Sequence, residues 1–215
     1  LTPYGTAQGI QYRNINGSPV SGEILSNNIN GGSIPISASY SDHVLIDPNV
    51  ITNSQDVGIL LEASNSCTVK DNIITNFVSN GIEVYGNDNL ISGNKIKDLT
   101  GYCYASISMY DAVGNTVLKN VISNIYSGDV SSITAAAWAI ATWDNAGVSS
   151  GNTIGDGTLA NANDVTLSDA SIVFYGTGTG NTAIGNKLYG NLPYGLNNFG
   201  GAAVTATGNW WGSAK

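Results

Sequence analysis

Apolar and polar residues alternate along most of the chain, and a short phrase recurs within this alternation. The phrase is an apolar residue, two variable positions, an asparagine, one variable position and a second apolar residue, as in residues 24–29 and 91–96. Five close copies and three weaker ones place the asparagines 22 to 34 residues apart. These asparagines are Asn27, Asn49, Asn72, Asn94, Asn120, Asn152, Asn186 and Asn209. A basic period near 22 residues is typical of a solenoid.

Within the repeats the apolar residues lie two positions apart, as do Ile82 and Val84 or Ile107 and Met109. This spacing favours strands over helices. We therefore expect each repeat to form one coil of short strands, stacked on its neighbour at the strand spacing of about 4.8 Å. Each asparagine would then lie above the previous one and hydrogen bond to it through its carboxamide. Such a ladder satisfies polar groups that are buried at a turn.

These coils resemble the right-handed parallel β-helix repeats of the pectin-lyase-like superfamily over nearly the whole chain. The resemblance implies an all-β fold, a single right-handed parallel β-helix of about eight coils over residues 1–215. The sequence Gly208–Ser213 also resembles the ending of β-helical surface proteins of archaea and bacteria. Because the superfamily includes pectate lyases, polygalacturonases, phage tailspikes and structural envelope proteins, the resemblance leaves the function open.

Longer spacings late in the chain predict two loop insertions, near residues 126–137 and 155–170. Such loops leave the wall of a solenoid and are natural places for lateral contacts or ligand specificity. Their alanine, serine, threonine and asparagine content indicates no particular chemistry.

Charged residues make up only 10% of the chain, and its net charge is −8 with seven basic residues. Nucleic-acid binding is not expected, because no basic stripe exists to neutralise phosphates. A membrane span is not expected either, because no run of 18 apolar residues occurs. The start at Leu1 and the low charge favour an exported protein, extracellular or at the cell surface, from which a signal peptide has been removed. One glycosylation sequon begins at Asn16.

Alignment on the asparagines places aromatic residues nine to eleven positions before five of them. This expected aromatic column comprises Tyr40, Tyr85, Tyr110, Trp143 and Tyr175. Two interpretations are open: the column packs the solenoid wall, or it offers a platform for sugar rings.

Carboxylates precede five asparagines by six to ten positions. This expected acidic column comprises Asp42, Glu62, Asp88, Asp111 and Asp144. Carboxylates about 5 Å apart could share a proton as in a glycosidase, or could hold calcium. The alternative is a row of solvated turn residues.

The sequence lacks several of the catalytic residues that the enzymes of this superfamily would require. A polygalacturonase-like site needs an Asp pair with a histidine, whereas His43 has only Asp42 beside it in sequence and is interpreted as a turn residue. Four lysines, Lys70, Lys95, Lys97 and Lys119, flank the asparagines and not the acidic column. The sequence therefore predicts no catalytic residue, no cofactor and no metal site.

The two cysteines fall on different sides of the expected coil. Cys67 lies five residues before its asparagine and Cys103 lies seventeen before its own, so an internal disulfide is not expected. One interpretation is a disulfide between molecules, from Cys67 of one chain to Cys103 of the next, which would build a ring or filament. The other is two buried free thiols.

Few residues precede the first copy or follow Trp210 and Trp211, so both ends of the solenoid are expected to be open unless these tryptophans close the core. The sequence thus predicts an extracellular structural protein that self-assembles, as a homo-oligomer or polymer, into a sheath, surface layer or filament of a prokaryotic, plausibly archaeal, envelope. The alternative is a carbohydrate-binding or carbohydrate-active β-helix, whose partner would be a neutral or cationic glycan.

Overall fold

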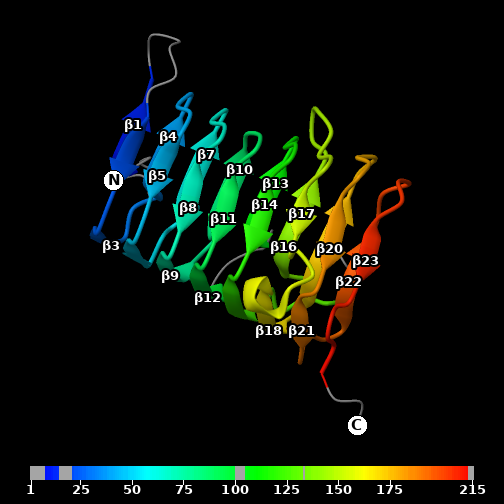
Figure 1. Ribbon diagram of the computed structural model, residues 1–215. Coiled ribbons are helices and arrows are strands. Elements are labelled where there is room, and N and C mark those ends of the chain that lie inside the picture. Colours follow the sequence, from blue (N-terminus) through cyan, green and yellow to red (C-terminus); the bar gives the residue numbers. More distant parts are fainter. Residues whose placement is uncertain (1–7, 15–20, 100–104, 133, 213–215) are drawn as a thin grey trace.

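The computed structural model describes residues 8–14, 21–99, 105–132 and 134–212, and the chain winds through them as a parallel β-helix (Figure 1). Each coil contributes one strand to each of three sheets, except the last described coil, which contributes strands to two of them, and the strand pairs are parallel. The coils stack in sequence order from the N-terminal to the C-terminal end (Figure 1). The all-β solenoid expected from the repeat is therefore confirmed.

Sheet A carries the longest strands and forms the face on which the candidate site lies. Its strands, in order, are β1 (Gln8–Arg13), β4 (Ile34–Ser39), β7 (Ile59–Glu62), β10 (Ile82–Tyr85), β13 (Ala105–Tyr110), β16 (Trp138–Trp143), β19 (Ala170–Tyr175) and β22 (Tyr194–Asn198).

Sheets B and C complete each coil with shorter strands. Sheet B comprises β2 (Gly22–Ile24), β5 (Val44–Ile46), β8 (Thr68–Lys70), β11 (Leu90–Ser92), β14 (Thr116–Leu118), β17 (Thr153–Ile154), β20 (Thr182–Ile184) and β23 (Thr205–Thr207). Sheet C comprises β3 (Asn28–Asn30), β6 (Val50–Thr52), β9 (Ile73–Phe77), β12 (Lys95–Leu99), β15 (Val121–Ile125), β18 (Asp164–Ser168) and β21 (Lys187–Tyr189).

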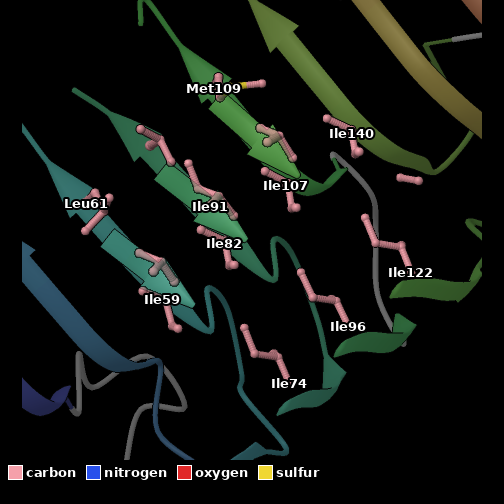
Figure 2. Packing of buried hydrophobic residues seen from close by; sticks show 14 of the residues in the cluster. Ile59, Leu61, Ile74, Ile82, Ile91, Ile96, Ile107, Met109, Ile122 and Ile140 are labelled. Atoms are coloured by element: carbon pink, nitrogen blue, oxygen red, sulfur yellow. The ribbon is translucent and has the colours of Figure 1, made fainter. Parts of the chain in front are cut away.

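Columns of aliphatic side chains fill the interior, because alternate residues of every strand point inward. Ile59, Ile82, Ile107 and Ile140 follow one another in register on sheet A, and all four are fully buried. Figure 2 shows this column facing isoleucines of the other sheets, among them Ile96. Burial of each such side chain contributes about 1.5–3 kcal/mol, so the core is the main source of stability.

The corner between sheets B and C holds a continuous asparagine ladder. Each Oδ1 accepts hydrogen bonds from the backbone N–H and the Nδ2 of the preceding asparagine, as Asn94 does from Asn72 at 3.0 Å each. The sixth position of the ladder differs from expectation, because Asn120 donates to Asn163 and not to Asn152. The ladder runs through Asn27, Asn49, Asn72, Asn94, Asn120, Asn163, Asn186 and Asn209.

A second, shorter ladder occupies the corner between sheets A and B, and Asn152 belongs to it. Asn89 donates its backbone N–H to Asn115 Oδ1, and from Asn115 to Asn152 to Asn181 both the N–H and the Nδ2 donate to the next Oδ1. Cys67 precedes them at the equivalent position: its N–H donates to Asn89 Oδ1 at 2.8 Å, and its Sγ accepts from Val44 N–H at 3.4 Å. The thiol thus replaces a carboxamide in this ladder.

The first predicted insertion packs back onto the outer face of sheet A. Residues 126–137 connect β15 to β16, and Ala136 and Trp138 form a small second apolar cluster with Ala105, Ala141, Ala170 and Val173. Asp169, which is 3% exposed, holds both ends of this loop, because its Oδ2 accepts from Ser127 N–H at 2.8 Å and from Ala137 N–H at 3.0 Å.

The second insertion is shorter than predicted. It comprises residues 155–163 between β17 and β18 and includes one 3₁₀ turn, η1 (Leu159–Asn161), whereas residues 164–168 belong to β18. In the described part of the chain, no helix is long and apolar enough to cross a membrane.

Candidate ligand-binding cleft

The outer face of sheet A carries an aromatic stack, defined here as Tyr85, Tyr110, Trp143, Tyr175 and Phe199. Four of the five expected members are present. Phe199, which sequence alignment did not include, extends the stack, with its ring centroid 6.1 Å from that of Tyr175.

Tyr40 does not join the stack, so its assignment to the aromatic column is wrong. It follows strand β4 with a positive φ of 53°, and its ring lies 6.0 Å from the guanidinium carbon of Arg13. The stack position on the preceding coil is held by Glu62, which pairs in register with Tyr85. A shift of one residue at the strand end accounts for the difference, because it changes the direction of the side chain.

Most ring faces in the stack cover one another. Tyr85 and Tyr110 lie 5.1 Å apart at 15°, and Trp143 and Tyr175 lie 4.2 Å apart at 11°. Between Tyr110 and Trp143 the planes are tilted by 48° at 6.4 Å. The stack therefore packs the wall of the solenoid along most of its length, and it opens at this one step.

A cleft of about 380 Å³ lies where the stack opens. It is lined by Ser79, Asn80, Glu83, Tyr85, Tyr110, Trp143 and Asn145. Three successive coils contribute to it, so no contiguous sequence motif encodes it. A concave surface that combines aromatic rings with a few fixed polar groups is the usual form of a small-molecule site.

The polar wall of the cleft is built around Glu83. Because Ile82 and Val84 point into the core, Glu83 and Tyr85 point outward into the cleft. Asn80 Nδ2 and the Tyr85 hydroxyl both donate hydrogen bonds to the carboxylate. Burial, only partly offset by these bonds, raises the pKa of Glu83 above its usual value. Sequence reasoning missed Glu83, although Asn80 three residues before it and Tyr85 two after it form a local signal.

The five expected acidic residues do not form one column, so that assignment is wrong. Asp42 accepts hydrogen bonds from Asn65 at a different corner position, and Glu62 lies in line with the aromatic stack. Asp88 stands on a left-handed turn beside Gly114. Turns of different length shift the carboxylates between columns, which separates groups that the spacing placed together.

Asp111 and Asp144 follow paired strands, and both serve as turn anchors. Asp111 accepts from the backbone N–H groups of Asn145 at 2.6 Å and Ala146 at 3.0 Å. Burial acts to raise the pKa of Asp111, but these backbone donors outweigh it and the pKa lies below its usual value. Asp144 accepts from Ser149 and Thr177 N–H groups on either side. Carboxylates saturated by backbone donors are suited to structure and not to proton sharing.

Cys67 is 1% exposed and its thiol points into the core, where burial chiefly raises its pKa. A disulfide to a neighbouring molecule requires an accessible sulfur, so the structure does not place Cys67 where that hypothesis needs it. Its proposed partner Cys103, and the sequon at Asn16, lie outside the described residues.

His43 is an exposed turn residue with a φ of 60°, as expected.

Fold and cleft together define the class of the chain, a parallel β-helix of the pectin-lyase-like type with a ligand-sized cleft on its longest sheet. The sequence profile of NosD, described as periplasmic copper-binding protein, matches residues 2–214, and the chain belongs to the NosD family. The periplasmic location in that description agrees with the expectation of a protein outside the cytoplasm. No curated protein and no solved structure matches the chain.

The copper named in the family description can be tested against the donors in this chain. Copper(I) prefers thiolate and thioether ligands, and copper(II) prefers imidazole. The sequence has one histidine, one methionine and two cysteines, and Met109 and Cys67 are buried while His43 is on an exposed turn. Across the described ranges, no three side chains of His, Cys, Asp or Glu converge as a metal site. The described residues therefore do not fit a copper centre.

Proposed function

We propose that this chain is an extracytoplasmic binding protein whose cleft on sheet A takes an oligosaccharide. The observation that carries the proposal is the opening of the aromatic stack between Tyr110 and Trp143, next to fixed polar groups. Sugar rings combine apolar faces with hydroxyl groups, and aromatic side chains that bind them usually lie beside hydrogen-bonding partners. The periplasmic description of the family supports a location where envelope glycans are accessible.

Removal of the aromatic wall tests the proposal. Trp143→Ala is expected to weaken binding of a glucosamine or N-acetylglucosamine tetramer by at least about tenfold, because one aromatic contact contributes roughly 1.5 kcal/mol beyond its buried area. Isothermal titration calorimetry against a panel of such oligosaccharides measures the effect.

Two further variants make that experiment decisive. Ser79→Tyr fills the cleft without removing a packed ring and is also expected to abolish binding. Trp211→Ala removes a half-exposed tryptophan outside the cleft and is expected to bind as the parent does. The proposal would be contradicted if all three variants, each shown to be folded by circular dichroism, bound the oligosaccharides with the affinity of the parent chain.

Self-association into an envelope structure is the second candidate, favoured by apolar side chains on the last described coil. Leu192 is 74% exposed, and Phe199, Trp210 and Trp211 are each about half exposed. Such a surface favours contact with another molecule. Self-association would raise the sedimentation coefficient as the protein concentration increases, and we expect the double substitution Trp210→Ser and Trp211→Ser to abolish that increase. A monomeric parent chain at all concentrations would rule this candidate out.

A further inference from the structure

Glu83 is held in one orientation by a neighbour that cannot turn. Asn80 is 1% exposed, and its Oδ1 accepts from Ala105 N–H at 3.0 Å and from Ser108 Oγ at 2.9 Å. The amide group of Asn80 is therefore fixed with its N–H toward Glu83. A fixed donor of this kind suits an ionised carboxylate, which accepts hydrogen bonds and donates none.

The carboxylate of Glu83 has no counter-charge from the protein in the described structure. The described lysines lie on sheets B and C and at the corner between them, and Arg13 on β1 is the sole described cation on sheet A. Because β1 is three strands from β10, Arg13 lies roughly 14 Å along the sheet. Asp56, the other carboxyl group that acts on Glu83, is also negative and is itself partly desolvated.

A desolvated carboxylate without a cation is costly, and a positively charged ligand relieves that cost. Two protein donors occupy part of the acceptor capacity of Glu83, which leaves lone pairs for a ligand on the side of the cleft. The surrounding acidic residues on the same face, among them Glu62 and Asp111, add to the negative field. They also repel an anionic glycan.

We infer that the cleft selects an oligosaccharide that carries a protonated amine, and that Glu83 recognises this amine. The inference rests on the proposed glycan-binding function and adds to it a class of ligand and a specificity-determining residue. The ammonium group donates to the free lone pairs of Glu83, while a ring of the sugar lies against Tyr110 and Trp143. Polyuronates are excluded from the site.

The test compares three ligands on three proteins by calorimetry at two ionic strengths. The ligands are the glucosamine tetramer, its fully N-acetylated counterpart and a galacturonate tetramer. The proteins are the parent chain, Glu83→Gln and Glu62→Gln. Both substitutions remove one negative charge from sheet A, but Glu62 lies outside the cleft lining, so the pair separates local recognition from net charge.

We expect the parent chain and Glu62→Gln to bind the glucosamine tetramer about tenfold or more tightly than the N-acetylated form, as one charge-assisted hydrogen bond implies. Glu83→Gln is expected to lose this preference and to retain binding of the N-acetylated form. An unchanged preference in Glu83→Gln overturns the inference, as does an equal loss in both variants, which would indicate net-charge attraction. Failure of the proposed function is distinct, because then Trp143→Ala and Ser79→Tyr leave every affinity unchanged.

Discussion

Replacement of Asn94 by alanine is expected to lower the free energy of unfolding by about 4 kcal/mol, the largest effect of any single polar substitution considered for this chain. Asn94 is fully buried in the middle of the long ladder. Its Nδ2 donates to Val69 O at 3.0 Å and to Asn120 Oδ1 at 3.0 Å, and its Oδ1 accepts two hydrogen bonds from Asn72. Alanine would leave these groups buried without partners, and each such group costs about 1–3 kcal/mol.

Urea unfolding followed by circular dichroism measures this loss, with Asn28→Ala as the matched control. Asn28 is an exposed asparagine on β3, and its replacement is expected to change stability by no more than about 0.5 kcal/mol. Because coils of a solenoid contact only their neighbours, disruption at Asn94 is also expected to broaden the transition. A loss below about 1 kcal/mol would show that the ladder does not stabilise the stack of coils.

Replacement of Asp169 by alanine is expected to cost about 3 kcal/mol and to detach the loop over residues 126–137. One carboxylate oxygen accepts from Ser127 N–H, Ser127 Oγ and Ala137 N–H, at 2.8 to 3.0 Å. Without it, these donors at both ends of the loop lose their acceptor. The apolar cluster around Trp138 then loses its contact with Ala136, which belongs to this loop. The Trp138 ring stacks on that of Trp143 at 5.2 Å.

Limited proteolysis of the loop, together with denaturant unfolding, reports this change. Asp129→Ala is the control, because Asp129 is an exposed residue of the same loop and its carboxylate accepts local hydrogen bonds from the backbone and side chain of Ser131. Its replacement is expected to leave both cleavage rate and stability close to those of the parent. If the loop of Asp169→Ala were cleaved no faster than that of the parent, other contacts would hold the loop in place.

The solenoid could be predicted from the sequence because its two causes are local and repeated. Alternation of apolar residues sets the strands, and an asparagine at the same corner of each coil sets the period. From Asn27 to Asn120 the spacing is regular and the ladder assignment is correct. Beyond Asn120 the insertions vary the spacing, and asparagines occur at two corners, so Asn152 and Asn163 could not be distinguished by counting.

The candidate site was less accessible to sequence reasoning, because its residues come from three coils and from strand ends. Tyr110 and Trp143 were placed correctly in one column, but the 48° tilt between their rings is a feature of side-chain packing that spacing along the chain does not encode. The acidic column failed for a related reason. Turn lengths between sheets A and B differ between coils, so equal distances from an asparagine do not give equal positions around the coil.

The central claim is that the cleft between Tyr85 and Trp143 on sheet A takes a saccharide. Amide chemical-shift mapping by NMR, during titration with the glucosamine tetramer and its N-acetylated counterpart, tests it most directly. We predict saturable shifts confined to residues 79–85, Tyr110 and residues 143–145. Shifts that gather instead around Trp210 and Trp211, or that do not saturate anywhere, would contradict the claim.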